Sequence, residues 1–249
     1  MYYYVYDEFV QGQKFERELA LVETRLTDLG ISGKIARLAL FRDPGEFIRD
    51  AVAQGAKTVI AVGDDRTLRK VIDAVGDEDV VLGIIPMTKD NNAIADILGM
   101  PQGVTACDIL SGRIVESLDI GVVSGHRFLH TAIIQTSPEM TVECEGQFKI
   151  YPPKKSTVEV RNMTFADALA RAANPIDGKI EIVVRDGGHS VFRKKTPATL
   201  VPVTHAKIMT GGPTVDLSVD GELFEGEEFH VSVLPGRIKM ITGKERKFS

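Results

Sequence analysis

The sequence contains no tryptophan, only two cysteines and few aromatic residues, which make up 6% of its 249 positions. Cys107 and Cys144 lack metal-ligand spacing and cannot supply a disulfide framework, so we expect a reducing compartment and a cytoplasmic location. No stretch approaches about 18 uninterrupted apolar residues, so we expect no transmembrane segment and at most peripheral contact with a membrane. The 43% of hydrophobic residues in turn exclude a disordered chain.

The sequence also lacks an excess of basic charge, since 30 Lys and Arg residues face 35 Asp and Glu residues. A nucleic-acid-binding protein normally carries a basic excess, so we expect no nucleic-acid partner. Residues 1–110 hold 12 basic and 18 acidic residues, a net charge of −6, whereas residues 111–249 hold 18 and 17, a net charge of +1. The surplus of acid therefore lies in the first part of the chain.

Up to about residue 100, short apolar runs alternate with segments that have the period of a helix, which is typical of βαβ units and a mostly parallel sheet. Apolar residues recur every three or four positions from Phe15 to Leu29, for example, which predicts a helix that Gly30 closes. The predicted strands are residues 2–6, 34–41, 58–62 and 80–85, and the predicted helices are residues 15–29, 44–52, 67–75 and 93–98. We therefore predict a mostly parallel α/β sandwich domain over residues 1–110.

The pattern changes in residues 111–249, where short β-branched runs alternate with turn signals such as Asp220-Gly221. This pattern predicts an antiparallel β-sandwich domain, in which only residues 165–173 look helical. The predicted strands are residues 113–119, 128–135, 157–161, 179–185, 198–203, 214–219, 228–233 and 237–242. A return of the chain to the first domain near the C-terminus is left open.

The most informative segment is the turn Gly63–Thr67, which reads Gly-Asp-Asp-Arg-Thr between a predicted strand and a predicted helix. In a parallel sheet this turn lies at the carboxyl edge, where ligands bind, and the start of the helix favours an anion such as a phosphate. The alternative is an acidic helix cap, because Asp65 and Thr67 both suit helix starts.

Three further segments are candidates for a functional role, and two of them have a structural alternative. The loop after Pro86 leads into a helix, and its structural alternative is a plain connection with Asn92 as the helix cap. The segment Leu118–Gly121 is followed by Phe128. The segment Asp220–Glu222 has a hairpin turn as its structural alternative.

Together the four segments resemble the diacylglycerol kinase catalytic family, which shares a superfamily with sphingosine kinases and, more distantly, NAD kinases. That family has a G-G-D-G-T loop, then P-x-G-T-x-N-x-x-A running into L-G-I-P, then I-D-L-G followed by F, and finally D-G-E. The matching stretches here are Gly63–Thr67, Pro86–Pro101, Leu118–Phe128 and Asp220–Glu222. The resemblance covers nearly the whole chain.

The resemblance implies a two-domain kinase that holds ATP between its domains, uses Mg²⁺, and transfers a phosphoryl group to a lipid hydroxyl. It implies Asp65 and Asp220 as catalytic residues, with Asp220 as the general base, and Asp65 and Glu222 as metal ligands. The implied nucleotide-binding residues are Gly63, Asp64, Arg66, Thr67, Thr88, Lys89 and Asn92. The implied partners are a nucleotide and a lipid or other small hydroxyl-bearing ligand, and the oligomeric state is left open, with a homodimer as one option.

Several positions depart from the family pattern. Asp64 and Arg66 replace two glycines, and a side chain forced into the left-handed region costs about 1–2 kcal/mol. Asp64 also adds a charge that repels a triphosphate by about 1 kcal/mol at ~4 Å in water. The segment Tyr6–Phe9 stands where the family has Asn-Pro-x-x-Gly. Arg66 and Lys89 offer cationic side chains for phosphate instead, although Arg66 could equally pair with Asp64 or Asp65.

Three functions remain open on the sequence. The first is a lipid-kinase-like transferase, with catalysis weakened by the altered loops. The second is a catalytically inactive descendant that binds a ligand or a partner with the same fold. The third is a relative of the NAD kinases, which the Leu118–Gly121 and Asp220–Glu222 segments make less favoured.

Overall fold

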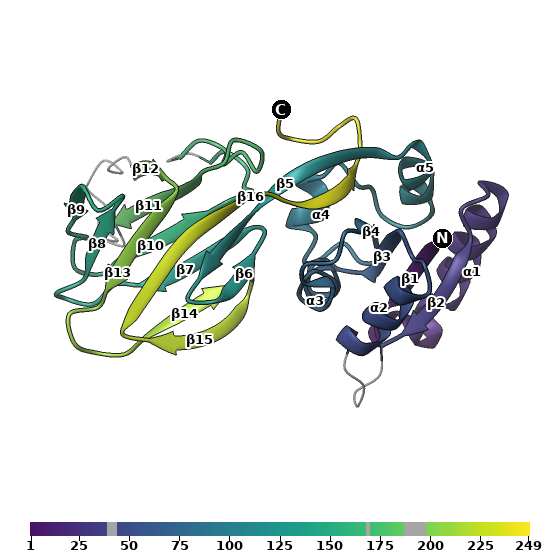
Figure 1. The fold of residues 1–249 in the computed structure, drawn as a ribbon, viewed down its shortest axis with the longest axis horizontal. Coiled ribbons are helices and arrows are strands. Elements are labelled where there is room, and N and C mark those ends of the chain that lie inside the picture. Colours follow the sequence, from purple (N-terminus) through teal and green to yellow (C-terminus); the bar gives the residue numbers. More distant parts are fainter. Residues whose placement is uncertain (39–43, 168–169, 187–197) are drawn as a thin grey trace. The chain divides into compact units, whose positions relative to one another are not determined.

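The computed structural model describes residues 1–38, 44–167, 170–186 and 198–249 (Figure 1). These residues form two compact units, which we call unit 1 (Met1–Ser117 with Ile238–Ser249) and unit 2 (Leu118–Arg237). The predicted domains, residues 1–110 and 111–249, remain a prediction. None of the described helices is long and apolar enough to cross a membrane.

The sheet of unit 1 is parallel. Its strands are β2 (Gly33–Arg37), β1 (Tyr2–Tyr6), β3 (Thr58–Gly63) and β4 (Val81–Pro86), in that order, followed by the end of β16 (Glu228–Thr242), which pairs with β4. All six residues of β3 are buried, as expected of a continuous apolar strand that is covered on both faces. The predicted mostly parallel sheet is thus confirmed; of the predicted strand 34–41, residues 39–41 lie outside the described part.

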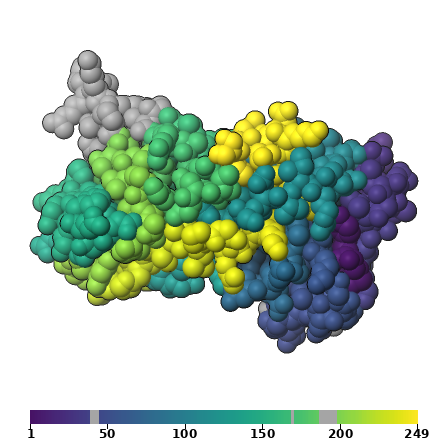
Figure 2. All heavy atoms as spheres, turned by 45° about the horizontal axis from the view of Figure 1, so that its top comes forward, coloured from purple at the N-terminus to yellow at the C-terminus, as the bar shows by residue number. Residues whose placement is uncertain are grey.

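Five α-helices accompany this sheet in the described residues of unit 1. They are α1 (Glu16–Asp28), α2 (Pro44–Ala53), α3 (Asp65–Val75), α4 (Ala93–Ile97) and α5 (Val104–Gly112), with two short 3-10 turns at η1 (Phe9–Gln11) and η2 (Gln13–Phe15). α3 buries Leu68, Val71, Ile72 and Val75, which share one helical face. The C-terminal residues return to α4, where Gly243 N donates to Leu98 O and Lys247 N donates to Ile97 O; Figure 2 shows this yellow end of the chain.

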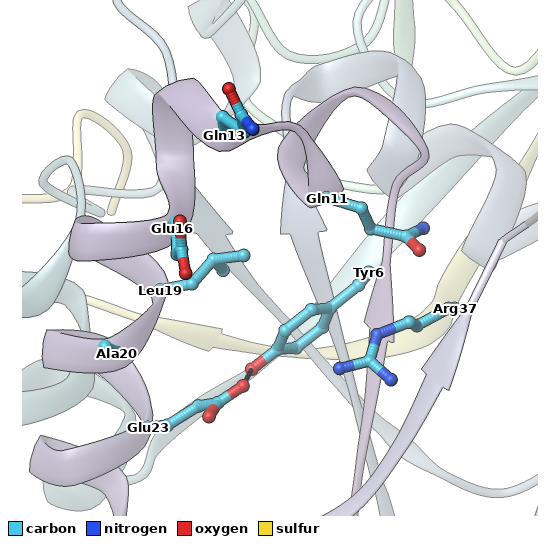
Figure 3. A pocket seen from close by; sticks show the side chains of 8 residues that line it. All are labelled: Tyr6, Gln11, Gln13, Glu16, Leu19, Ala20, Glu23 and Arg37. Carbon is cyan, nitrogen blue, oxygen red and sulfur yellow. Dashed lines mark hydrogen bonds between the residues drawn. The ribbon is translucent and has the colours of Figure 1, made fainter.

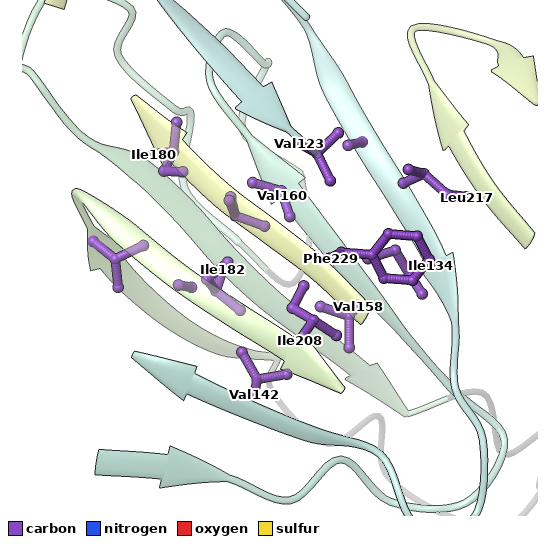
Figure 4. Close-up of a cluster of buried hydrophobic side chains, with 14 of the residues drawn as sticks. Val123, Ile134, Val142, Val158, Val160, Ile180, Ile182, Ile208, Leu217 and Phe229 are labelled. Carbon is purple, nitrogen blue, oxygen red and sulfur yellow. The ribbon is translucent and has the colours of Figure 1, made fainter. Parts of the chain in front are cut away.

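Unit 2 consists of antiparallel strands. One sheet has the order β12-β11-β10-β7-β14-β15, and the other joins β16, β13, β8 and β9, while β5 pairs with β6. The strands are β5 (Ile114–Val123), β6 (His126–Phe128), β7 (Thr131–Gln135), β8 (Thr141–Cys144), β9 (Phe148–Ile150), β10 (Ser156–Arg161), β11 (Ile180–Asp186), β12 (Thr199–Val203), β13 (His205–Met209), β14 (Val215–Val219) and β15 (Glu222–Gly226). Side chains from both sheets, such as Val158, Ile182, Ile208 and Phe229, pack into one buried cluster (Figure 4). The predicted antiparallel β architecture is confirmed.

The predicted helix at residues 165–173 is wrong. Its described residues are not helical, and residues 168 and 169 lie outside the described part. Asp167 accepts a hydrogen bond from Ala170 N at 2.9 Å and one from Arg161 Nη2 at 2.9 Å. Because the Asp167 side chain bonds its own loop and a strand residue, these contacts replace the helical geometry that the local sequence favours.

Candidate functional site

The turn after β3 is a capped helix start. The Asp64 Oδ1 atom accepts hydrogen bonds from Arg66 N at 3.0 Å and Thr67 N at 3.1 Å, and Asp64 N donates to Thr67 Oγ1 at 3.1 Å. Asp64 has an extended φ of −131°, and Arg66 lies within α3, so neither position carries the left-handed strain expected from the loss of glycine. The helix-cap alternative is confirmed, with Asp64 rather than Asp65 as the capping residue.

This cap uses the donors that a phosphate would need. Besides Arg66 N and Thr67 N, which Asp64 binds, Asp65 N donates to Asn91 O at 2.9 Å and Leu68 N donates to Asp64 O at 3.0 Å. The start of a helix binds an anion through N–H groups that lack partners within the helix. A phosphate can therefore reach the backbone of α3 only by displacing Asp64 or Asn91.

Asp65 joins the turn to the second loop. Its Oδ2 accepts from Ile94 N at 2.8 Å and its Oδ1 from Ala95 N at 3.2 Å, at the start of α4. This contact satisfies two backbone donors that the short helix leaves open. Both carboxylate oxygens of Asp65 are thus engaged with backbone, and its predicted catalytic and metal-binding roles remain predictions.

Asp7 is a third aspartate at this edge, and no role was predicted for it. Asp7 directly follows β1, is 7% exposed, and donates its N–H to Val62 O at 3.0 Å. Its Oδ2 accepts from the buried Thr67 hydroxyl at 2.9 Å and from Lys70 Nζ at 3.1 Å. The Asp7 carboxylate therefore engages the Thr67 hydroxyl, and Thr67 is one of the residues that the resemblance assigns to nucleotide binding. The departure of Tyr6–Phe9 from the family pattern was the only signal of this contact.

The second loop, residues 87–92, follows β4 at the same edge, because Gly63 at the end of β3 pairs with Pro86 at the end of β4. Thr88 Oγ1 donates to Asp90 O at 2.7 Å, and Asn92 Nδ2 donates to Thr88 O. Asn92 is 8% exposed and stands at the cap position of α4, but its side chain makes no capping bond. Its Oδ1 is buried and has no hydrogen-bond partner among the described residues.

Two cations lie near this edge, Arg66 in the first turn of α3 and Lys89 in the second loop. Arg66 and Lys89 are both exposed, and neither forms an ion pair within the described part of the chain. The alternative that Arg66 pairs with Asp64 or Asp65 is therefore not observed. Because the ends of β3 and β4 are neighbours, the structure brings both cations, together with Asn92, to one edge of the sheet.

These residues fit the phosphates of a nucleotide through side chains rather than through backbone. The guanidinium of Arg66 and the ammonium of Lys89 suit phosphate oxygens, whereas Asn92 Oδ1 is buried and its predicted role in nucleotide binding remains a prediction. Mg²⁺ fits less well, since the described residues contain no group of three His, Cys, Asp or Glu side chains placed to hold a metal.

In unit 2, Asp220 occupies the hairpin turn between β14 and β15, as the structural alternative predicts, with φ of 45° at Asp220 and 88° at Gly221. Its carboxylate accepts from Leu129 N at 2.8 Å, His130 N at 3.1 Å and Thr131 N at 2.8 Å. Burial raises the pKa of Asp220 above its ordinary value, although these three donors oppose the shift. Its predicted role as the general base remains a prediction.

Glu222 lies at the first position of β15, opposite Val219, and is exposed. It belongs to unit 2 with Asp220, whereas Asp65 and the nucleotide-binding residues belong to unit 1. Its predicted role as a metal ligand remains a prediction.

Asp119 and Asn162 form a polar network that the sequence did not reveal. Asp119 is 2% exposed and accepts from Gly236 N and Gly178 N, both at 2.7 Å; burial raises its pKa above the ordinary value. Asn162 Nδ2 donates to Asp119 O and to Leu129 O, both at 2.9 Å. Since Leu129 N also donates to Asp220, the third and fourth family segments are tied together inside unit 2.

Comparisons with known proteins agree with this architecture. Residues 2–123 match the family described as the diacylglycerol kinase catalytic domain. A diacylglycerol kinase structure from Bacillus anthracis str. Sterne is similar with a TM-score of 0.80 and 17% identity, over 98% of this chain and 97% of that chain. An NAD kinase from Archaeoglobus fulgidus, solved in complex with ATP, is similar with a TM-score of 0.61 and 11% identity, over 99% of this chain and 95% of that chain. No curated protein matches the chain.

These findings confirm the resemblance to the superfamily of lipid kinases and NAD kinases, and with it the predicted fold class. At such low identity the structural likeness is one of fold. The chemistry must be argued from the residues of this chain.

Proposed function

We propose that this chain, whose residues 2–123 match the diacylglycerol kinase catalytic domain, is a lipid-kinase-like transferase with weakened nucleotide binding. It binds ATP at the carboxyl ends of β3 and β4, mainly through side chains. The acceptor is the hydroxyl of a lipid or of a similar small molecule. When bound, ATP supplies the phosphoryl group that is transferred.

One observation carries the proposal: Arg66 and Lys89 lie exposed near the ends of the adjacent strands β3 and β4, without ion pairs to described residues. In this role Arg66 and Lys89 hold the phosphates, and Asn92 supports the second loop through its bond to Thr88 O. Positioning and charge neutralisation are what phosphoryl transfer chiefly requires of a protein. Asp220 of unit 2 is the proposed general base, and this role requires its carboxylate to leave its bonds to backbone N–H groups.

The expected affinity for ATP is low, because backbone N–H groups of α3 are not available to the phosphates. Asp64 holds two N–H groups of α3, so the phosphates gain only the cationic side chains. We expect a Kd for ATP on the order of 1 mM, equivalent to about 4 kcal/mol of binding free energy. Thermal shift measurements with ATP, with and without magnesium, test this step, because a ligand that binds the native state raises the apparent stability. Absence of any shift at several millimolar ATP would overturn the proposal.

The second candidate is a catalytically inactive protein that keeps the fold to bind a ligand or a partner. It is favoured by Asp220, because both of its carboxylate oxygens already accept hydrogen bonds from the backbone. An engaged carboxylate of this kind is typical of a structural anchor in a turn.

A phosphorylation assay separates the two candidates. Purified protein is given ATP, magnesium and either a short-chain diacylglycerol or NAD as acceptor, which also tests the NAD kinase alternative. Under the first candidate, wild type turns over diacylglycerol and Asp220→Asn does not, whereas Asp216→Asn, an exposed control on the preceding strand β14, keeps the activity. Turnover of wild type no higher than that of Asp220→Asn, together with measurable ATP binding, selects the second candidate.

A further inference from the structure

A cavity of about 370 Å³ lies in unit 1 between α1, the 3-10 turns, and the carboxyl ends of β1 and β2. None of its lining residues belongs to the predicted nucleotide site. The residues that matter here are Tyr6, Gln11, Glu16, Leu19, Glu23 and Arg37 (Figure 3). The volume is at the lower end of the range for small-molecule sites, so a ligand there must be small.

Charges of both signs line this cavity without neutralising each other. α1 contributes Glu16 and Glu23, and β2 contributes Arg37. In the described residues, neither Arg37 nor Glu16 takes part in an ion pair, and Arg37 and Glu23 lie too far apart to pair directly. Figure 3 shows Glu23 and Arg37 on different sides of the Tyr6 ring. Opposite charges so placed attract a ligand that carries both signs.

The neutral groups around these charges are fixed. Burial raises the pKa of Tyr6, so its phenol stays protonated. The Tyr6 hydroxyl donates a hydrogen bond to Glu23 Oε1 at 3.2 Å. This bond engages one carboxylate oxygen of Glu23 and leaves the other, Oε2, for a ligand. Gln11 Nε2 donates to Asp7 O at 3.2 Å and to Leu38 O at 3.0 Å. Gln11 Oε1 is then held in place as an acceptor. Leu19 adds an apolar surface.

We propose that this cavity binds a small zwitterion, with its anionic group on Arg37 and its protonated amine on Glu23. A guanidinium binds carboxylate or phosphate oxygens in bidentate fashion, and carboxylates accept from an ammonium group. A simple anion would be repelled by the two glutamates, and a simple amine by Arg37. A molecule with both groups meets a favourable charge at each end. The inference does not depend on the proposed kinase activity.

Isothermal titration calorimetry on the full chain tests the inference with phosphoethanolamine as the probe. Inorganic phosphate and ethanolamine, each carrying one of its two charges, are the matched half-ligands. We expect phosphoethanolamine to bind at least about tenfold more tightly than either half, since each end adds a charge-assisted contact. No heat from phosphoethanolamine at 10 mM (roughly −2.7 kcal/mol of binding free energy), or equal affinity for all three probes, overturns the inference.

Two variants test which residue binds which end of the ligand. Arg37→Gln and Glu23→Gln should each weaken phosphoethanolamine binding about tenfold, and the glutamine at position 23 keeps an acceptor for the Tyr6 hydroxyl. Arg17→Gln is the control, because Arg17 is exposed on α1 and outside the cavity. Unchanged binding in Arg37→Gln, with an unchanged melting temperature, contradicts the assignment.

The zwitterion could come from a free metabolite or from a lipid headgroup. Co-sedimentation with phosphatidylethanolamine vesicles, compared with phosphatidylglycerol vesicles, distinguishes these sources. Sedimentation that requires phosphatidylethanolamine and is lost in Arg37→Gln assigns the headgroup. Binding of free phosphoethanolamine without sedimentation assigns a soluble ligand.

Discussion

The two units use aspartate in the same way, but they leave different groups for a ligand. In unit 1, Asp64 and Asp65 bind the backbone at the starts of α3 and α4, and exposed cations remain beside them. In unit 2, Asp119 and Asp220 bind loop backbone and connect through Asn162 and Leu129. The motif aspartates of both units therefore bind the backbone of their own units, and in the proposed function the phosphates are bound by the exposed cations of unit 1, Arg66 and Lys89.

The largest expected effect concerns the anchor of unit 2. Replacing Asp220 by Ala leaves the N–H groups of Leu129, His130 and Thr131 without their acceptor. Since each buried unsatisfied donor costs about 1–3 kcal/mol, we expect the free energy of unfolding to fall by about 3 kcal/mol. Urea unfolding followed by circular dichroism measures this. The exposed control Asp216→Ala should stay within about 0.5 kcal/mol of wild type; equal loss in both variants would show that Asp220 is no anchor.

A smaller effect is expected from the corresponding aspartate of unit 1. Asp64→Ala removes the cap of α3 and should cost about 1 kcal/mol, whereas Asp64→Ser keeps a capping oxygen and should cost only a few tenths. The same urea titration measures both variants. If serine were as destabilising as alanine, the capping role of Asp64 would be wrong.

The contact between Asp7 and Thr67 should limit anion binding in unit 1. Asp7→Asn removes one negative charge beside the Thr67 hydroxyl and keeps an oxygen that accepts from it. We expect the affinity for inorganic phosphate to rise about fivefold, the equivalent of about 1 kcal/mol of relieved repulsion. Calorimetry with Asp96→Asn as the exposed control in α4 checks this. An unchanged Kd for phosphate would show that the Asp7 carboxylate does not weaken phosphate binding at this edge of the sheet.

The two cysteines report on the two units without disturbing either. Cys107 lies in unit 1 and Cys144 in unit 2, and both are fully buried. Burial raises the pKa of Cys107 from 9.0 to about 11, which lowers its thiolate fraction at pH 8 about 100-fold. Burial raises the pKa of Cys144 as well. We expect neither thiol to react with a disulfide reagent at pH 8 until its unit opens.

Thiol labelling in increasing urea then follows one unit at a time. Cys144→Ser leaves only Cys107, which reports on unit 1, and Cys107→Ser leaves only Cys144, which reports on unit 2. With Asp220→Ala in the background, Cys144 should become reactive at lower urea and Cys107 should not. Rapid labelling of either thiol in the native protein would contradict its burial.

The sequence was sufficient for the main architecture because its apolar pattern is strong there. The strand β3 is a continuous apolar run, and α3 repeats its buried residues with helical spacing. α5 was missed because Thr105, Ser111 and Gly112 interrupt the pattern and only three of its nine residues are buried hydrophobics. The short strands β8, β9, β13 and β15 were also missed, because three to five residues carry too little alternation to stand out.

The candidate site was harder to predict, since its decisive contacts join residues that are far apart in sequence. Asp7 and Thr67 are 60 positions apart, and Asp220 reaches Leu129 across 91 positions. Local sequence also suggested strain at Asp64, because it could not show that the turn after β3 is a helix cap with φ of −131°. The motif residues could thus be located from sequence, but their hydrogen-bond partners could not.

In the proposed function, exposed side chains at the edge of unit 1, rather than the backbone of α3, hold the nucleotide. Calorimetric titration of ATP into wild type and into the double variant Arg66→Gln, Lys89→Gln tests it most directly, with Arg17→Gln, Lys57→Gln as a control of equal charge. The account predicts a Kd on the order of 1 mM for wild type and the control, and at least about tenfold weaker binding for the double variant. Equal affinity in all three proteins, or no binding to any, would contradict it.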